Sequence, residues 1–303
     1  MKEMTELQRR MLQAFPDASL RLEEPLSQHT SFKIGGPCEV LAFPRSVAEL
    51  AAMLCAAAAW GVQPAVLGAG TNILAADQGR RGLVICTKGC LEGMEQVGET
   101  RIRVQSGVTM ARAAVFAAGL GLSGLEFAHG IPGTVGGGVY MNAGAYGGEI
   151  KQVAVRTEFL DLSGKPHALE GEAQDFSYRH SAFTQKPCVV TSVEFALTMK
   201  PETEIRAKMQ ELMARRRASQ PLELPSAGST FKRPIGGYAA ALIEQAGLKG
   251  LTVGGAAVST KHAGFVVNMG NATAEDVLSL IKQIQERVFD NSGIRLEPEV
   301  LLL

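Results

Sequence analysis

The sequence predicts an α+β protein with about two domains, and three observations indicate this. Its 303 residues are roughly twice the length of an average domain. Segments with strand and helix patterns alternate over the first third of the chain, whereas the middle is rich in β-branched residues at a period of two. After Pro201 helical patterns return, so we expect a domain boundary there.

The elements of the first third follow from hydrophobic periodicity and capping residues. Residues 2–15 are amphipathic and predict a short helix. Ser46 and Glu49 have the spacing of a capping box, which predicts a helix that ends near Gly61. The other predicted elements are strands at 38–43, 65–67, 83–88 and 101–106 and a helix at 109–119.

Two long strands and two long helices dominate the rest of the chain. Segments with a period of two predict antiparallel strands at 153–160 and 189–199. A helix of about 18 residues follows Pro201, and Thr273 begins another whose apolar residues share one face. Shorter elements are predicted at 238–246, 251–258, 264–268 and, as a closing strand, 294–303.

The charge balance argues against large anionic partners. Thirty Lys and Arg offset thirty Asp and Glu, whereas proteins that bind nucleic acid or anionic lipid through a broad basic field carry an excess of positive charge. The N-terminus has no signal-peptide core, and the longest apolar run is shorter than the roughly 20 residues of a membrane-spanning helix. The five cysteines have no zinc spacing. We expect a cytoplasmic protein with reduced thiols, no metal, no nucleic-acid partner and no membrane insertion.

Glycine is concentrated in residues 130–148, which hold eight glycines in nineteen positions. Each glycine inside a helix or strand costs about 0.5–1 kcal/mol relative to Ala, so this density indicates a bending loop. Bare N–H groups in such loops bind phosphate oxygens, although a purely structural loop is the alternative. The candidate ligand-binding residues are Gly130, Ile131, Pro132, Gly133, Thr134, Gly136, Gly137 and Asn142.

A second glycine-rich turn, LGAGTNIL at residues 67–74, follows a short apolar strand. It is not a G-x-G-x-x-G fingerprint, because Ile73 occupies the third position, and it is not a P-loop. Its candidate donors lie in Gly68, Ala69, Gly70, Thr71, Asn72 and Ile73. Two such turns about 60 residues apart predict one long ligand with a central diphosphate, that is, a dinucleotide.

Charged clusters later in the chain predict an anionic substrate. The segment PSAGSTFKRP at 225–234 places Ser229, Lys232 and Arg233 in one short loop, where cations suit an anion. A solvated charged loop is the plainer interpretation. Further candidates are Arg216 and Arg217 at a helix end, Arg179 in YRHSAF, and Glu297 and Glu299 in LEPEV, between which spacing alone does not choose.

Taken together, these motifs resemble the UDP-N-acetylenolpyruvoylglucosamine reductase (MurB) family. The length of 303 residues matches the shorter, type II branch, which lacks an inserted loop with a substrate-contacting Tyr. The matching segments lie in order from about residue 27 to residue 301 and are HTSFKIGG, LGAGTNIL, GIPGTVGGGVYMNAGAYGGEI, YRHSAF, GSTFKRP, AGLKG, KHAGFVVN and LEPEV.

The resemblance implies an FAD-binding domain of the vanillyl-alcohol-oxidase (PCMH) type. Residues 1–200 would form this domain in two α+β subdomains split near residue 90. Residues 201–303 would form an α+β substrate-binding domain whose last strand returns to the active site. FAD would be bound non-covalently, in line with the lack of a His or Cys in residues 68–74, and NADPH would be the co-substrate.

The resemblance also implies the reaction and its catalytic residues. NADPH reduces FAD, and the flavin passes hydride to the enolpyruvyl ether of a UDP-linked sugar, which gives UDP-N-acetylmuramate for peptidoglycan synthesis. The family's catalytic residues fall on Arg179 as carboxylate ligand, Ser229 as proton donor and Glu299 as a protonated donor to the developing charge. The candidates for the UDP diphosphate are Lys232, Arg233, Arg216 and Arg217.

Two other functions stay open at this point. Another FAD-dependent enzyme of the same fold, acting on a sugar or alcohol, would use the same glycine-rich turns. A nucleotide-binding sensor would keep the turns and lack the chemistry. The order of Arg179, Ser229 and Glu299 along the chain favours the reductase.

Overall fold

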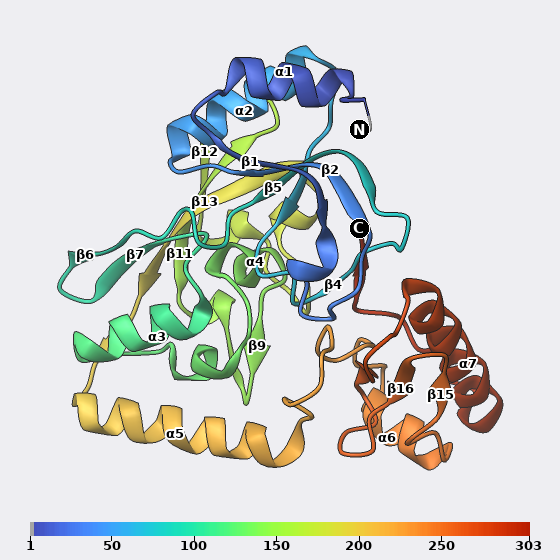
Figure 1. Cartoon of the computed structure of the whole chain (residues 1–303). Coiled ribbons are helices and arrows are strands. Elements are labelled where there is room, and N and C mark those ends of the chain that lie inside the picture. Colours follow the sequence, from blue (N-terminus) through green and yellow to red (C-terminus); the bar gives the residue numbers. More distant parts are fainter. Residues whose placement is uncertain (1–2) are drawn as a thin grey trace. The chain divides into compact units, whose positions relative to one another are not determined.

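The computed structural model describes residues 3–303, which fold into two compact units (Figure 1). Unit 1 takes in the chain up to residue 22, residues 40–69 and residues 82–216. Unit 2 takes in residues 23–39, 70–81 and 217–303. The units therefore exchange chain segments, whereas the boundary expected at Pro201 divides the chain once. None of the helices between residues 3 and 303 is both long and apolar enough to cross a membrane.

The first sheet contains the early predicted strands. Its order is β1 (Ser19–Pro25), β2 (Pro37–Phe43), β5 (Arg80–Cys86) and β3 (Ala65–Leu67), with β3 parallel to β5. Helices α1 (Glu6–Ala14) and α2 (Val47–Ala59) share a hydrophobic core with β2 and β5. Figure 1 shows both helices on the same side of these strands. The first residue of the helix predicted over 2–15 lies outside the described residues.

The cap of α2 differs in one detail from the prediction. Ser46 accepts from the N–H of Glu49, as expected of an N-cap. The Glu49 carboxylate, however, accepts from the N–H of Arg45 (2.6 Å) and not from that of Ser46. Half of the predicted capping box is therefore present, and the other half is displaced by one residue.

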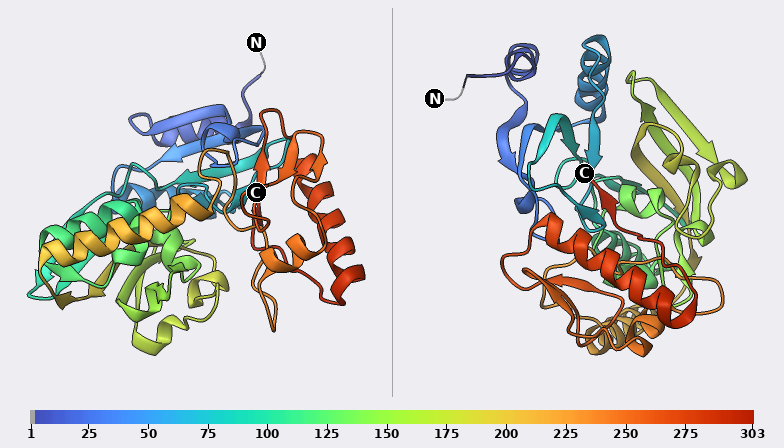
Figure 2. Two further views of the ribbon diagram at one scale, coloured as in Figure 1. Left: turned by 90° about the horizontal axis from the view of Figure 1, so that it is seen from below. Right: turned by 90° about the vertical axis from the view of Figure 1, so that its right-hand side faces the viewer.

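The second sheet of unit 1 is antiparallel throughout. It confirms the two long strands predicted in the middle of the chain. Three helices contribute side chains to the core beside this sheet, and Figures 1 and 2 show α3 and α5 side by side. The strands, in order, are β12 (Pro166–Glu170), β11 (Ala154–Asp161), β13 (Cys188–Ala196), β7 (Arg101–Gln105) and β6 (Met94–Gly98), and the helices are α3 (Met110–Gly119), α4 (Val135–Tyr140) and α5 (Glu202–Ser219).

Helix α4 contradicts the prediction that residues 130–148 are wholly a bending loop. Gly136, Gly137 and Gly138 all lie inside it. A Cβ on Gly136 would stand 2.8 Å from Cβ of Ser106, and one on Gly138 would stand 2.8 Å from Sδ of Met110. Close packing against these neighbours requires glycine, and it outweighs the low helix propensity of the segment.

Unit 2 is built on a small antiparallel sheet of β15 (Thr252–Val253), β16 (Ala256–Val258) and β17 (Val266–Asn268). Helices α6 (Ala239–Gln245) and α7 (Ala274–Ser292) share its core. The predicted cap of α7 is confirmed, because Thr273 and Asp276 form a complete capping box. Short two-stranded pairs complete the structure: β8 (Leu122–Ser123) with β14 (Thr198–Met199), and β9 (Gly144–Ala145) with β10 (Gly148–Glu149).

The closing strand predicted over 294–303 is much shorter than expected. Only β18 (Leu301–Leu302) forms, and it pairs in parallel with β4 (Ile73–Leu74). Pro298 has no N–H to donate to a ladder, and it makes only an isolated bridge with Phe231. The segment before β18 is therefore extended but irregular.

Candidate active site

The turn that follows β3 presents a row of unbonded backbone N–H groups. Within residues 3–303, the N–H groups from Gly68 to Asn72 form no hydrogen bond. A Cβ on Gly68 would stand 2.5 Å from Oγ1 of Thr134, and one on Gly70 would overlap the carbonyl oxygen of His29. Successive bare N–H groups held this closely fit the diphosphate of a dinucleotide.

The second glycine-rich segment offers fewer free donors than its sequence predicts. The N–H groups of Ile131, Gly133 and Gly136 already donate to Ala128, Ile131 and Ser106. The N–H of Gly137 donates to Oγ1 of Thr134, the N-cap of α4. Most of these glycines therefore serve packing and turn geometry, and a contact between this segment and a cofactor stays a prediction.

Asn142, a candidate ligand-binding residue, is held by hydrogen bonds within unit 1, and its contact with a cofactor stays a prediction. Its side chain is 1 % exposed and donates to the Glu149 carboxylate and to the Ser177 carbonyl, both at 2.9 Å. Its Oδ1 accepts from the N–H of Lys151. Both amide N–H groups are thus used inside unit 1, where they tie the glycine-rich segment to the turn that carries Arg179.

Arg179 lies in a tight turn with a disfavoured backbone conformation. Ser177 and His180 exchange backbone hydrogen bonds of 3.1 and 3.2 Å across this turn. The φ of Arg179 is +54°, a left-handed value that costs a non-glycine residue about 1–2 kcal/mol. Such conformations are concentrated at functional sites, where they fix the direction of a side chain. The guanidinium carbon lies 5.2 Å from the ring centroid of Tyr178.

His180 belongs to the support of this turn. Its Nε2 lies 3.2 Å from the Asp175 carboxylate, and its Nδ1 lies 2.9 Å from Oγ1 of Thr184. In the described part of the chain, no group of three or more His, Cys, Asp or Glu side chains is arranged to hold a metal ion.

Arg216 is a partly buried cation in unit 1. Its Nε is buried and has no hydrogen-bond partner within residues 3–303, and burial lowers the pKa of the guanidinium. A Cβ on Gly130 would stand 3.2 Å from Cδ of Arg216, so the arginine lies against the start of the glycine-rich segment. A desolvated cation without an acceptor is costly, which makes Arg216 a candidate ligand for an anionic group.

Unit 2 brings several predicted residues together at one short antiparallel contact. The N–H of Glu299 donates to the carbonyl of Thr230 (2.8 Å), directly after Ser229. The Asn72 amide donates to the carbonyl of Glu299 (3.0 Å), and the carbonyl of Asn72 accepts from Leu301. Asn72 from the first glycine-rich turn, Thr230 from the loop at 225–234 and Glu299 from LEPEV therefore lie together within this unit. The hydroxyl of Ser229 itself donates weakly to the carbonyl of Phe231 (3.4 Å).

The two glutamates of LEPEV have different surroundings, which the sequence did not distinguish. Glu297 is on the surface, with a side chain 75 % exposed and Oε2 3.3 Å from Nζ of Lys232. Glu299 is partly buried beside Thr230 and Asn72. A carboxyl group that must stay protonated near neutral pH needs desolvation, so the surroundings favour Glu299 over Glu297 for that role.

Two residues of unit 2 that contact candidate site segments were not singled out from the sequence. Ser31 donates its hydroxyl to the carbonyl of Ser226 (2.6 Å), and its N–H donates to the carbonyl of Gly70. It thus links the HTSFKIGG segment to both loops, but a single serine gives no signal in a sequence. Tyr238 is 61 % exposed, and the guanidinium carbon of Arg233 lies 4.5 Å from its ring centroid. Its position directly after two glycines was the available signal.

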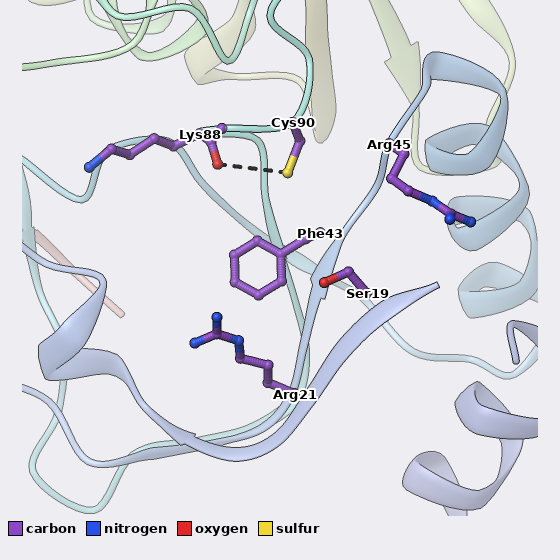
Figure 3. A pocket seen from close by; sticks show the side chains of 7 residues that line it. Ser19, Arg21, Phe43, Arg45, Lys88 and Cys90 are labelled. Atoms are coloured by element: carbon purple, nitrogen blue, oxygen red, sulfur yellow. Dashed lines mark hydrogen bonds between the residues drawn. The ribbon is translucent and has the colours of Figure 1, made fainter. Parts of the chain in front are cut away.

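A separate open cavity of about 330 Å³ lies in unit 1 (Figure 3). The Phe43 ring stands at its centre, and the Arg21 guanidinium carbon lies 5.4 Å from the ring centroid. Arg45, at its rim, is bonded to Glu49. The lining residues are Ser19, Arg21, Phe43, Arg45, Lys88, Gly89 and Cys90, and no predicted site residue is among them.

Comparisons with known proteins confirm the predicted fold and cofactor domain. A family model described as FAD binding domain matches residues 38–170. A model of the UDP-N-acetylenolpyruvoylglucosamine reductase C-terminal domain matches residues 220–303. An alkyldihydroxyacetonephosphate synthase structure shares the fold alone, with a TM-score of 0.50 and 18 % identity over 65 % of this chain and 41 % of that chain.

Relatives of much higher identity cover almost the whole chain. A UDP-N-acetylenolpyruvoylglucosamine reductase of Agathobacter rectalis is 46 % identical over 302 residues, which is 95 % of each chain. One of Caldanaerobacter subterraneus subsp. tengcongensis is 45 % identical over 95 % of this chain and 94 % of its own. The crystal structure of the Thermus caldophilus reductase superposes with a TM-score of 0.80 at 35 % identity, over 94 % of this chain and 98 % of that one. The two family models and the full-length relatives thus match the same group of enzymes. This chain belongs to the UDP-N-acetylenolpyruvoylglucosamine reductase family.

Proposed function

We propose that the chain reduces UDP-N-acetylenolpyruvoylglucosamine to UDP-N-acetylmuramate, with NADPH as reductant. The observation that carries this proposal is identity of 46 % over 95 % of the chain to a reductase of that name. FAD, when bound, supplies the hydride chemistry between the two substrates. A role in peptidoglycan synthesis and a cytoplasmic location are parts of the same proposal.

The two family models support a division of labour along the chain. The FAD-binding model lies within residues 1–200, and the reductase C-terminal model lies within residues 201–303. We assign FAD binding to the first range and substrate binding to the second. The unbonded N–H groups from Gly68 to Asn72 would hold the FAD diphosphate.

Arg179 is assigned to the carboxylate of the enolpyruvyl group. Addition of hydride to the double bond leaves negative charge next to this carboxylate, and fixed donors stabilise such charge better than mobile water does. A planar guanidinium binds a carboxylate through two parallel hydrogen bonds. The left-handed turn at Arg179 and the Asn142 hydrogen bond to Ser177 would hold that geometry.

Ser229 and Glu299 are assigned to the proton and to the developing charge. Ser229 delivers a proton to the α-carbon of the enolpyruvyl group, and a protonated Glu299 donates a hydrogen bond to the charge that forms there. The hydrogen bond from Glu299 N–H to the Thr230 carbonyl supports the pairing, because it fixes the spacing of the two backbones.

Cations are assigned to the UDP diphosphate. Arg216 is the best supported, because its buried Nε has no acceptor within residues 3–303. Lys232 is half-exposed and pairs with Glu297, so substrate would compete with that carboxylate for its ammonium. Arg217 is exposed.

Ser229→Ala tests the proton-transfer assignment. Loss of the hydroxyl removes the proton donor and leaves FAD binding intact. We expect NADPH to reduce the flavin at the wild-type rate in stopped-flow experiments. Reduction of the enolpyruvyl substrate should slow by about 10²–10⁴-fold, the usual contribution of a general acid.

The control is Ser226→Ala, in the same loop three residues earlier. Its hydroxyl has only a 3.4 Å contact with the N–H of Gly228, so both half-reactions should stay near wild type. A Ser229→Ala enzyme that is slow in flavin reduction, or fast with the enolpyruvyl substrate, would show that the serine has been misassigned.

A further inference from the structure

The loop that follows Lys232 carries an exposed aromatic residue, Tyr238. The guanidinium carbon of Arg233 lies 4.5 Å from the ring centroid of Tyr238, which is within the range of a cation–π contact. Tyr238 is nevertheless 61 % exposed, so much of this residue stays accessible to solvent. The two side chains form a layer in which the guanidinium backs the ring.

The same loop has an apolar tip and room to move. Ile235 is 99 % exposed, an unfavourable state for a large aliphatic side chain. Gly236 has a φ of +82°, and an added Cβ on Gly236 or Gly237 would meet nothing within 4 Å. The two glycines lie between Pro234 and α6, so the segment can change its backbone angles without disturbing the helix.

The residues next to this loop indicate the chemistry of a ligand that could lie against Tyr238. Lys232 lies directly before Arg233, and its N–H donates to the carbonyl of Glu297 (2.9 Å), close to the hydrogen bond between Glu299 and Thr230. Lys232 is assigned to the UDP diphosphate, and the nucleoside of UDP is attached directly to that diphosphate. A pyrimidine ring stacks on an aromatic side chain irrespective of its hydrogen-bonding edge, because every base has a π-face.

Resting on the proposed function, we propose that Tyr238 is the stacking platform for the uracil ring of the UDP-sugar. Arg233 backs the ring and is not a ligand of the diphosphate. Ile235 covers the nucleoside when the loop closes. Specificity for a nucleotide-linked sugar over the free sugar then depends on this loop, while Arg179, Ser229 and Glu299 act on the enolpyruvyl group.

The test compares UDP with inorganic pyrophosphate as ligands of the FAD-loaded enzyme, by calorimetry. We expect Tyr238→Leu to weaken UDP binding about tenfold or more and to leave pyrophosphate binding unchanged, because only UDP has a base to stack. Tyr238→Phe keeps the ring and should bind UDP within about threefold of wild type. Arg233→Gln should weaken UDP less than Tyr238→Leu does and should not affect pyrophosphate.

The matched control is Phe289→Leu on α7, where Arg295 covers an exposed ring at 4.7 Å in the same unit. This variant should bind both ligands like wild type. If Tyr238→Leu weakened the binding of UDP and of pyrophosphate equally, or did not weaken UDP binding, the stacking role of Tyr238 would be overturned. If Arg233→Gln weakened pyrophosphate binding, Arg233 would be a ligand of the diphosphate, and its proposed role as a support for the Tyr238 ring would be overturned.

Flavin reduction by NADPH separates this inference from the proposed function. Each variant should retain FAD and the wild-type rate of flavin reduction, which shows that it has folded. A wild-type enzyme that binds UDP and reduces the enolpyruvyl sugar, together with an unaffected Tyr238→Leu, would refute the platform alone. A wild-type enzyme that neither binds UDP nor reduces that sugar would refute the proposed function and the platform together.

Discussion

At the scale of single residues, the backbone of Arg179 is held in a conformation that costs local stability and fixes the direction of its side chain. Arg179 has a φ of +54°, although glycine would take this conformation without strain. Its turn is braced by the Asn142 hydrogen bond to Ser177 and by His180. The sequence places Arg179 beside an aromatic residue and in a recognisable motif. It does not reveal the backbone strain, because a left-handed arginine has no compositional signature.

Replacement of Arg179 should separate strain from function. Arg179→Ala and Arg179→Gly both lack the guanidinium, so both should lose enolpyruvyl reduction and keep flavin reduction. At an ordinary backbone position Ala is the more stable of the two, but at a left-handed position Gly should be more stable by about 1 kcal/mol. Urea unfolding of the two variants measures the difference. A more stable Ala variant would mean that Arg179 is not held in the left-handed region in solution.

At the scale of elements, periodicity and caps predicted most of the structure. Thr273 marked the start of α7, and the period-2 segments marked β11 and β13. The predictions for two segments were wrong because contacts between segments distant in the sequence determine their structure. Half of the residues in helix α4 are glycine, and two of these glycines pack closely against Ser106 and Met110. The final segment lacks a ladder around Pro298, and its register depends on β4, which is more than 200 residues away in the chain.

The glycines of α4 should not respond equally to substitution. Gly136→Ala would place a methyl group 2.8 Å from Cβ of Ser106, and such overpacking typically costs about 1–3 kcal/mol. A Cβ on Gly137 meets only Oγ1 of Thr134, at 3.6 Å, so Gly137→Ala should stabilise the FAD-free protein by about 0.5–1 kcal/mol. Chemical denaturation of both variants without FAD makes the comparison. Similar effects at the two positions would contradict the packing account.

The FAD affinity of Gly137→Ala then tests the predicted cofactor contact of this segment. Weaker FAD binding in a more stable protein would place the cofactor against Gly137. Unchanged binding would leave the turn from Gly68 to Asn72 as the principal phosphate ligand.

At the scale of the whole molecule, each compact unit is made of three separate segments, so the units do not follow the order of the chain. The sequence predicts a division at Pro201 because composition changes there, and periodicity along a chain contains no information on which distant segments pack together. In the structure, most of α5, up to Arg216, belongs to unit 1, although the helix follows Pro201. Unit 2 recruits residues 23–39 and 70–81 in exchange. LGAGTNIL was predicted to bind a cofactor and HTSFKIGG only matched the family, and the part of either segment in the C-terminal core could not be predicted.

This exchange has a consequence for the isolated C-terminal segment. Phe32, Ile34 and Leu74 are almost fully buried in the core of unit 2, yet they lie outside residues 217–303. The amide of Asn268 also donates to the carbonyl of Phe32 (3.0 Å), and β18 pairs with β4. A fragment of residues 217–303 therefore lacks part of its core and a strand partner. We expect it to show no cooperative thermal transition by circular dichroism.

Two further proteins make this expectation decisive. The same fragment joined through flexible linkers to residues 23–39 and 70–81 regains the missing core, so it should melt cooperatively. In the full chain, Phe32→Ala should destabilise unit 2 by about 3–5 kcal/mol, the usual cost of removing a buried aromatic ring. Cooperative melting of residues 217–303 alone would mean that this segment forms its own core. Residues 23–39 and 70–81 would then not be needed for folding of this segment, and the division of the chain at Pro201 would describe the molecule better than the compact units do.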